Sequence, residues 1–274
     1  MTYRNIMVRL GLHADNGPLL RLAAELAARL EARVIGIAAS CPYPITYSDS
    51  LAAVSAEAVA EARDIIARSV DDCETQFRTA MKGSVKDVEW RSTIAAESIS
   101  GYLAKEARAA DLVITNYDEV SGPDYLNPGE LAIRAGRPVL AVPPDLSSLR
   151  LRKAVVAWKD TREARRAVVD ALPLLKLADT CTLLEVTSLD SVGYCRQRLE
   201  DIAGWLASHG VSSEVSPVGV GGSHGLFLAD ELRRLSPDLI VAGAYGHSRL
   251  AEWAFGGVTR NILLQPQFCV LVSH

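Results

Sequence analysis

Short runs of Val, Ile and Leu alternate with segments of helical spacing along the 274 residues of the chain. Such alternation is typical of βαβ units that wind around a parallel sheet. Each half of the chain contains five apolar runs, so the pattern predicts an α/β fold with two doubly wound, five-stranded parallel sheets. The predicted strands are Ile6–Leu10, Val34–Ala39, Val85–Arg91, Leu112–Thr115, Val139–Val142, Ala154–Trp158, Thr182–Val186, Val211–Val215, Leu239–Ala242 and Cys269–Val272.

Between these runs, apolar residues recur at the spacing of a helix face. Pro173 lies within the second of three such stripes, and we expect it to kink or break that helix. Gly210 follows the third stripe and is expected to cap the carboxyl end of its helix. The three stripes are Leu19, Leu22, Leu26 and Leu30; Val168, Leu172 and Leu175; and Leu199, Ile202 and Leu206.

The second half of the chain repeats the order of the first. The repeat predicts two domains, residues 1–147 and 148–274, joined by a proline-containing linker. If the strand order in each is 3-2-1-4-5, the first and fourth strands flank the crevice in which doubly wound sheets bind ligands. The matching segments are Asp111–Ile114 with Asp238–Val241, and Pro138–Val142 with Phe268–Val272.

Composition narrows the functional classes. The formal charge of −4 and the pI near 5.8 do not suggest a nucleic-acid binder, which normally carries a basic face. No apolar run approaches the ~20 residues of a membrane helix, and the amino-terminal segment lacks the apolar centre of a signal peptide. We therefore expect a soluble, cytoplasmic protein without nucleic-acid or membrane partners. Scattered cysteines without a C-x-x-C pair indicate reduced, mostly core residues rather than a zinc site or disulfides: Cys41, Cys73, Cys181, Cys195 and Cys269.

The segment GAYGHSRLAEWAFGGVTR, residues 243–260, follows the apolar run of the last but one predicted strand. Glycine permits positive φ and lets another group approach the backbone closely. Gly243 and Gly246 would bend the loop at the strand end, and Gly256 and Gly257 would begin the next helix. A helix start presents unpaired N–H groups and the positive end of the helix dipole, which together favour an anion such as phosphate.

The spacing G-x2-G-x9-G-G resembles that of the universal stress protein family, whose loop reads G-x2-G-x9-G followed by Ser or Thr. The resemblance covers the whole chain as two fused copies, each with a flavodoxin-like, Rossmann-like fold. In that family the loop holds the phosphates and ribose of ATP. The resemblance therefore implies ATP or another adenine nucleotide in the second half, with Mg²⁺ only as the companion of the nucleotide. The implied binding residues are Ala157, Lys159 and Val186 on the adenine side and Ala242, Gly243, Tyr245, Gly246, Gly256, Gly257 and Val258 in the loop.

Two positions depart from the family pattern. Gly257 replaces the hydroxyl residue, which removes one hydrogen bond worth about 1 kcal/mol net. Lys159 stands at the end of the first strand, where members that bind ATP usually carry Asp, and its ammonium group would attract phosphate instead. Asp160 is a substitute carboxylate in one interpretation. In the favoured one, Asp160-x-x-Glu163 is a helix N-cap followed by an acid in the first turn.

The first half lacks this loop. Its first strand runs into Leu10-Gly11 without an acid, and residues 116–126 have no such glycine spacing. Its fourth helix is predicted to begin at Asn127-Pro-Gly-Glu130, an N-cap with a proline in the first turn and an acid that would repel phosphate. We therefore expect no nucleotide in this half.

Other features have structural interpretations. The glycine-rich segment 219–225 misses the dinucleotide-binding fingerprint and is interpreted as a flexible loop. His247, beside the phosphate loop, is interpreted as an exposed helix-capping residue rather than a phosphate ligand. The segment Tyr43–Tyr47 is interpreted as an ordinary loop before a helix rather than a cover for the crevice. No catalytic triad, carboxylate pair or metal-ligand spacing is evident, so no catalytic residue is assigned.

By resemblance, the function is stress-response ligand sensing by a regulatory protein that binds an adenine nucleotide. One alternative is an interaction scaffold that has lost nucleotide binding. A second is a slow nucleotide hydrolase or transferase, for which only His247 and Asp160 are candidate bases. Family members pair through their last strands, and Phe268–Val272 would be an exposed apolar edge if unpaired. A tandem chain would satisfy much of this internally, while a homodimer beyond it and regulatory partner proteins stay open.

Overall fold

The computed structural model describes residues 2–41, 56–96, 98–117, 125–221, 224–244 and 267–274. The first half contains β1 (Asn5–Arg9), α1 (Gly17–Leu30), β2 (Arg33–Ala39), α2 (Ala56–Met81), β3 (Val88–Thr93), α3 (Ile99–Glu106), a 3-10 turn (Ala107–Ala109), β4 (Leu112–Asn116), α4 (Pro128–Ala135) and β5 (Val139–Val142). The second half contains β6 (Lys153–Ala157), α5 (Arg162–Leu175), β7 (Thr180–Ser188), a 3-10 turn (Leu189–Ser191), α6 (Val192–Ser208), β8 (Glu214–Val220), α7 (His224–Leu235), β9 (Leu239–Gly243) and β10 (Cys269–Ser273).

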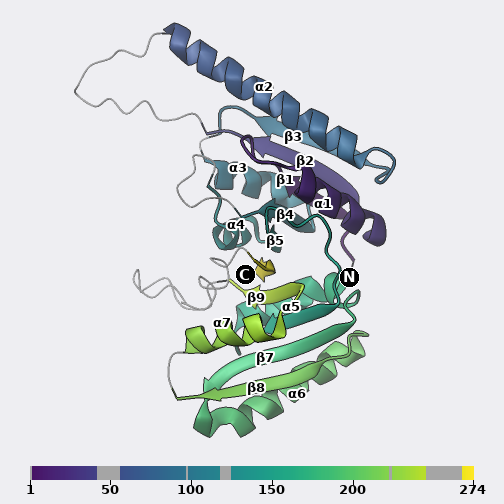
Figure 1. Cartoon of the computed structure of the whole chain (residues 1–274), viewed down its shortest axis with the longest axis vertical. Helices are drawn as coiled ribbons and strands as arrows, with labels where there is room; N and C mark the ends of the chain where they lie inside the picture. The colour runs from purple at the N-terminus through teal and green to yellow at the C-terminus, as the bar shows by residue number, and fades with distance from the viewer. Residues whose placement is uncertain (1, 42–55, 97, 118–124, 222–223, 245–266) are drawn as a thin grey trace, which may run out of the picture.

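The described strands form one sheet in the order β3-β2-β1-β4-β5-β10-β9-β6-β7-β8 (Figure 1). Each half contributes five strands in the predicted order 3-2-1-4-5, and the neighbours within each half run parallel. The molecule therefore has the α/β, doubly wound architecture expected from the alternation of strand and helix patterns.

The two halves meet at β5 and β10, which pair in antiparallel orientation. Leu140 lies opposite Leu271, and every residue of both strands is buried. This seam confirms the expectation that the last strands pair within the chain. It also covers two apolar edges that would otherwise be open to another sheet.

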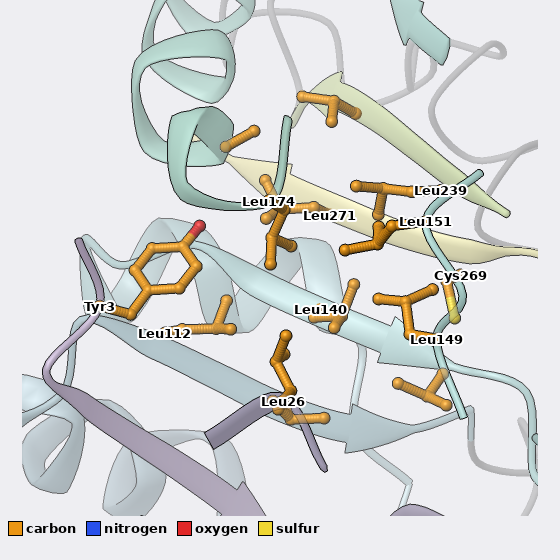
Figure 2. Packing of buried hydrophobic residues seen from close by; sticks show 14 of the residues in the cluster. Tyr3, Leu26, Leu112, Leu140, Leu149, Leu151, Leu174, Leu239, Cys269 and Leu271 are labelled. Carbon is orange, nitrogen blue, oxygen red and sulfur yellow. The ribbon is translucent and has the colours of Figure 1, made fainter. Parts of the chain in front are cut away.

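Two hydrophobic clusters cover the two faces of the sheet, and each contains residues from both halves. In the cluster drawn in Figure 2, Leu26 of α1 and Leu140 of β5 belong to the same core as Leu174 of α5 and Leu271 of β10. The halves thus share their cores across the seam. The division into residues 1–147 and 148–274 stays a prediction from the repeat.

Two aspartates at equivalent positions of the sequence repeat make the same pair of hydrogen bonds in each half. Asp111 Oδ2 accepts hydrogen bonds from the backbone N–H groups of Arg4 and Asn5, at 2.8 and 2.9 Å. Asp238 Oδ2 accepts two bonds of the same lengths from the N–H groups at the start of β6. Each carboxylate ties the chain before the fourth strand of its half to the start of the first strand.

The pairing registers correct the predicted match of the last strands. Val113 pairs with Val139, and its equivalent Ile240 pairs with Val270. Val139 is therefore equivalent to Val270, one residue beyond the predicted match with Cys269. Both strands are apolar and buried along their length, so no alternation of polar residues marks their register in the sequence.

Strands β3 and β8 begin three residues later than predicted. Val85 and Val211, which the pattern placed in these strands, complete helix ends instead. The N–H of Val85 donates to the Met81 carbonyl at 3.1 Å, and that of Val211 to the Leu206 carbonyl at 3.0 Å. An apolar residue just past a helix end often packs back on the last turn, which mimics the start of a strand in the sequence.

The two expectations about helix ends have different outcomes. Helix α5 continues through Pro173 to Leu175, so the proline does not break it. Pro173 lies in the last turn, where the missing N–H removes a single hydrogen bond of the helix. Helix α6 ends as predicted: Gly210 directly follows the C-cap residue His209, has a left-handed φ of 82°, and donates its N–H to the Ala207 carbonyl at 3.0 Å.

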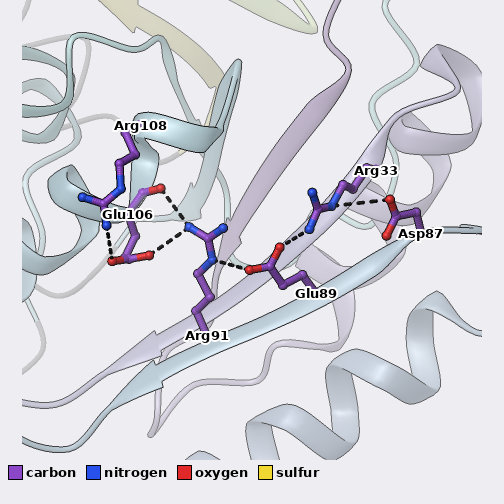
Figure 3. Close-up of polar contacts among 6 residues, drawn as sticks. All are labelled: Arg33, Asp87, Glu89, Arg91, Glu106 and Arg108. Carbon is purple, nitrogen blue, oxygen red and sulfur yellow. Dashed lines mark hydrogen bonds and ion pairs between the residues drawn. The ribbon is translucent and has the colours of Figure 1, made fainter.

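The edge strand β3 carries a chain of ion pairs, drawn in Figure 3: Arg33, Asp87, Glu89, Arg91, Glu106 and Arg108. Arg91 is its centre, because Nε donates to Glu89 Oε1 at 2.7 Å and Nη1 donates to Glu106 Oε2 at 2.8 Å. The hydrogen bond from Arg91 lowers the pKa of Glu89 despite partial burial of the carboxyl. The chain ties β3 to α3 and places charges on a strand edge, which disfavours pairing with another sheet.

Candidate functional site

The candidate site lies where the sheet of the second half reverses its winding, at the carboxyl ends of β6 and β9. Ala157 and Ala242 pair there directly, and Gly243 ends β9. Val186 lies on β7, the other neighbour of β6. Lys159 follows β6 and is exposed. The structure therefore brings together the predicted residues that it describes.

The remaining predicted loop residues lie outside the described ranges: Tyr245, Gly246, Gly256, Gly257 and Val258. His247 and the segment Tyr43–Tyr47 also lie outside them.

On the face of the sheet that α7 covers, the candidate site has an apolar floor. Ala157 and Val186 are half-buried and pack against the hydrophobic cluster that contains Leu184 and Leu228. Ala157 pairs with Leu184, and Val186 lies two residues further along the same strand, on the same face. Because alanine is small, the strand ends leave little side-chain bulk at this edge of the sheet.

Packing requires a glycine at position 243, a requirement that the sequence motif did not reveal. A Cβ atom at this position would lie 2.6 Å from the backbone nitrogen of Ala164 and 2.7 Å from the carbonyl carbon of Glu163. Both atoms belong to the first turn of α5, which cannot move aside as the end of a flexible side chain can. Glycine at 243 therefore permits helix α5 to lie directly against the end of β9.

The start of α5 corrects the interpretation of Asp160. Thr161 is the N-cap residue, and its hydroxyl accepts a hydrogen bond from Ala164 N at 3.4 Å. Asp160 instead pairs with Arg165, with 2.5 Å between Oδ1 and Nη2. Glu163 does occupy the first turn, as predicted. The predicted cap was wrong by one residue because Asp and Thr are both good N-cap residues and stand side by side.

Arg162 and His274 lie beside Ala244, the residue after Gly243. The sequence analysis did not identify either of them. His274 Nδ1 lies 2.9 Å from the Ala244 carbonyl, and its Nε2 lies 3.3 Å from Arg162 Nη2. A carbonyl only accepts, so Nδ1 carries the hydrogen and Nε2 accepts from Arg162. No sequence pattern could have found this contact, because it joins residues 112 positions apart.

Glu163 is the buried acid of this corner. Burial of its side chain would raise the pKa of the carboxyl, but hydrogen bonds from Arg162, its own backbone and Thr161 outweigh that effect and lower it. Arg162 Nε donates to Glu163 Oε1 at 2.5 Å. The carboxylate is therefore ionised at neutral pH and engaged with its neighbour in the sequence.

Helix α5 is fixed to the seam by a buried polar cluster. Asp170 Oδ2 accepts hydrogen bonds from Ser273 Oγ at 2.5 Å and from Arg166 Nε at 2.9 Å. The Tyr3 hydroxyl donates to the Asp170 carbonyl at 2.5 Å, so the first half also contacts this helix. Burial, with a smaller effect of the Asp170 charge, raises the pKa of Tyr3 well above its usual value. The cluster ties the middle of α5 to β10 and to the first half of the chain.

The equivalent place in the first half is filled by larger side chains. Arg9 ends β1 and is 4% exposed, and Asn116 ends β4 and is 7% exposed. The predicted helix start is confirmed, because Asn127 Oδ1 accepts from Gly129 N at 2.9 Å and from Glu130 N at 3.1 Å. The side chain of the N-cap thus takes up two of the N–H groups that an anion would otherwise need.

Neither a reactive cysteine nor a group of metal ligands marks a second site among the described residues. The five cysteines all lie in the described ranges and form no disulfide; Cys41 is half-buried and the others are buried. Burial raises the pKa of Cys181 to about 11 and that of Cys269 to about 12, which leaves both as unreactive thiols at neutral pH. Within the described ranges, no three His, Cys, Asp or Glu side chains are grouped as metal ligands. The described helices also include none with the length and apolar character to span a membrane.

No protein-family model and no curated protein matches the sequence. The structure nevertheless resembles solved structures over its whole length. A universal stress protein from Archaeoglobus fulgidus DSM 4304 is 12% identical, with a TM-score of 0.74 over 98% of this chain and 95% of that chain. A functionally unknown protein from Pseudomonas aeruginosa PAO1 has a TM-score of 0.64 at 15% identity, covering 99% of this chain and 92% of its own.

A candidate universal stress protein from Pseudomonas aeruginosa UCBPP-PA14 also has a TM-score of 0.64, at 16% identity, over 99% of this chain and 93% of its own. At these identities the likeness establishes a shared architecture. The chain has the fold of universal stress proteins, and the resemblance indicated by the glycine spacing is confirmed at that level.

Proposed function

We propose that the chain binds ATP or a related adenine nucleotide in its second half and acts as a ligand-sensing regulatory protein in a stress response. The observation that carries the proposal is the position of the glycine spacing. The segment that begins at Gly243 leaves β9 directly beside the end of β6. Doubly wound sheets bind their ligands in the crevice at this point, where the winding reverses.

The described residues supply surfaces of the kind that a nucleotide requires. Ala157 and Val186 present a half-buried apolar floor, suited to one face of an adenine ring. Arg162, with a side chain that is 78% exposed, and Lys159 bring positive charge to the start of α5. The phosphates would then lie over the glycine segment, where Tyr245, Gly246, Gly256, Gly257 and Val258 complete the proposed site.

The proposal is tested by mass spectrometry of any small molecule released on denaturing the purified protein, followed by calorimetric titration. ATP, ADP and AMP are titrated into the wild type and Gly246→Val, with Gly204→Val as the matched control. Gly204 is exposed on α6, and a Cβ there would meet no atom within 4 Å. We expect nucleotide binding to the wild type and the control, and its loss in Gly246→Val. Absence of binding at millimolar nucleotide would refute the proposal.

One observation favours a second candidate function, an interaction scaffold without nucleotide. Gly243 is required for the packing of α5 on β9 whether or not a ligand binds. The first glycine of the spacing would therefore be retained in a protein that had lost its nucleotide. A wild type without bound ligand, in which Gly246→Val leaves both folding and assembly unchanged, would support the scaffold. Association with a second copy and with regulatory proteins belongs to either proposal.

A further inference from the structure

A cavity of about 410 Å³ lies where the linker between the halves meets the starts of β6, β9 and β10. This volume falls in the range of small-molecule sites. The cavity adjoins the amino ends of β6 and β9, whereas the proposed nucleotide crevice lies at their carboxyl ends, so the two places are separate. Its charged and hydroxyl-bearing lining residues are Asp145, Ser147, Ser148, Arg150, Arg152 and Asp238.

Two arginines belong to this lining, Arg150 and Arg152. Arg150 and Arg152 are exposed, and neither side chain forms a hydrogen bond or an ion pair within the part of the chain that the structure describes. The same holds for the hydroxyl groups of Ser147 and Ser148 among the described residues. A guanidinium group matches the geometry of phosphate oxygens, and hydroxyl groups can donate to the same oxygens.

The backbone between the two arginines is held in an unfavourable conformation. Leu151 has a left-handed φ of 54° and is completely buried. A branched L-residue seldom adopts this conformation, and such residues gather at ligand sites. The turn is fixed, because the N–H of Asp179 donates to the Leu151 carbonyl and that of Thr180 to the Arg152 carbonyl, both at 3.0 Å. Arg150 and Arg152 therefore flank an anchored turn.

Two aspartates, Asp145 and Asp238, also line the cavity. Their carboxylates restrict which ligands could bind there. Asp238 Oδ2 already accepts hydrogen bonds from the N–H groups of Arg152 and Lys153. Asp145 is exposed on the linker, where it can accept hydrogen bonds from hydroxyl groups of a ligand. A bare divalent cation is disfavoured by the two arginines. The lining suits a molecule with a phosphate at one end and hydroxyl groups at the other.

We propose that this cavity binds a sugar phosphate. Its phosphate contacts Arg150 and Arg152, and its hydroxyl groups contact Asp145 and the serines of the linker. The ligand would connect the linker to the second half, independently of any nucleotide at the glycine segment.

The test is a calorimetric titration of ribose 5-phosphate into the wild type, Arg150→Ala/Arg152→Ala and the control Arg21→Ala/Arg196→Ala. All four arginines are exposed, so the variants should fold, which thermal melting verifies. We expect binding to the wild type and the control, and affinity weakened at least about tenfold in Arg150→Ala/Arg152→Ala, since charge-assisted hydrogen bonds are lost. Arg150→Glu should weaken it further, because it also reverses a charge.

Two further titrations separate this site from others. Ribose 5-phosphate should bind Gly246→Val as tightly as the wild type, because the glycine segment is not part of the cavity. Loss of binding in Gly246→Val, no binding to the wild type, or full binding to Arg150→Ala/Arg152→Ala would overturn the proposal. Inorganic phosphate that binds as tightly as ribose 5-phosphate would overturn the sugar-phosphate assignment.

Discussion

The carboxyl ends of β1 and β4 and those of β6 and β9 have the same topology but hold different side chains. The pairing registers make Arg9 equivalent to Ala157, and Asn116 equivalent to Gly243. In the first half, the buried Arg9 and Asn116 occupy the end of the sheet. In the second half, the equivalent positions hold an alanine and a glycine, Ala157 and Gly243. One scaffold thus provides a place filled by its own side chains and a place lined by small residues.

The connections into the following helices explain part of this difference. Residues 10–16 join β1 to α1, whereas residues 158–161 join β6 to α5. In the longer connection the buried Asn16 accepts from Gly11 N and donates to the Gly11 carbonyl, both at 3.0 Å. The shorter connection brings the first turn of α5 against β9, where a Cβ would collide with it. A glycine in a ligand-binding motif can therefore be required by the packing that a short connection imposes, as well as by contact with a ligand.

The largest expected effect comes from adding a Cβ at the tight contact. Gly243→Ala should lower the free energy of unfolding by about 3 kcal/mol, because backbone must shift to make room. Asn116→Ala, at the equivalent position, should cost no more than about 1 kcal/mol. Urea unfolding of both variants measures the difference. Equal stabilities would mean that the packing of α5 on β9 does not require the glycine.

The next effect is on ligand affinity. Ala157→Arg copies the first half into the second and should weaken ATP binding by about 100-fold, since a long side chain would occupy the proposed adenine floor. Ala157→Ser changes the size little and serves as the control. Calorimetric titration with ATP distinguishes them. Unchanged affinity in Ala157→Arg would place the adenine elsewhere.

Alkaline pH should weaken the contacts between the halves. Burial raises the pKa of Tyr117, and the Tyr117 hydroxyl donates to the Phe268 carbonyl at 3.2 Å. The folded state keeps this proton above pH ~10 while the unfolded state releases it, so the contribution of Tyr117 to stability is full below that pH and falls by about 1.4 kcal/mol per pH unit above it.

Urea unfolding at pH 9 to 11 measures this loss in the wild type, in Tyr117→Phe and in Tyr194→Phe. Tyr194 is 70% exposed, so its variant should follow the wild type. Tyr117→Phe should show a shallower decline with pH. The same slope in all three proteins would contradict a role for Tyr117.

The smallest effect compares two helix caps. Asn127 accepts two backbone hydrogen bonds at 2.9 and 3.1 Å, whereas Thr161 accepts one at 3.4 Å. Asn127→Ala should cost about 1 kcal/mol and Thr161→Ala about 0.5 kcal/mol. Thermal unfolding measures both, and a larger cost at Thr161 would reverse the ranking.

Much of the architecture could be predicted because the sheet is built from buried, apolar strands. All ten predicted runs correspond to strands, and the Asn127 cap follows from a pattern confined to four residues. The errors arose where two physical roles share one sequence signal. Val211 completes a helix end although a valine there is equally typical of a strand, and α5 continues through Pro173 although the proline removes one backbone hydrogen bond.

The candidate site could be predicted only in part. Ala157, Ala242 and Gly243 come together as expected, because strand order alone brings their ends together. Arg162 and His274 could not be found, since their contact depends on how α5 lies against the end of β10. The cavity at the linker is likewise formed by segments that no local pattern relates.

Leu140 opposite Leu271 marks the pseudo-twofold axis of the molecule, because these residues are equivalent in the two halves. In a homodimer built on such a seam, each substitution would appear on both sides of the axis. A single chain has no such duplication, so arginine can stand at one crevice position and alanine at the other. The fused chain can therefore specialise one end of a symmetric sheet while the opposite end keeps its own residues.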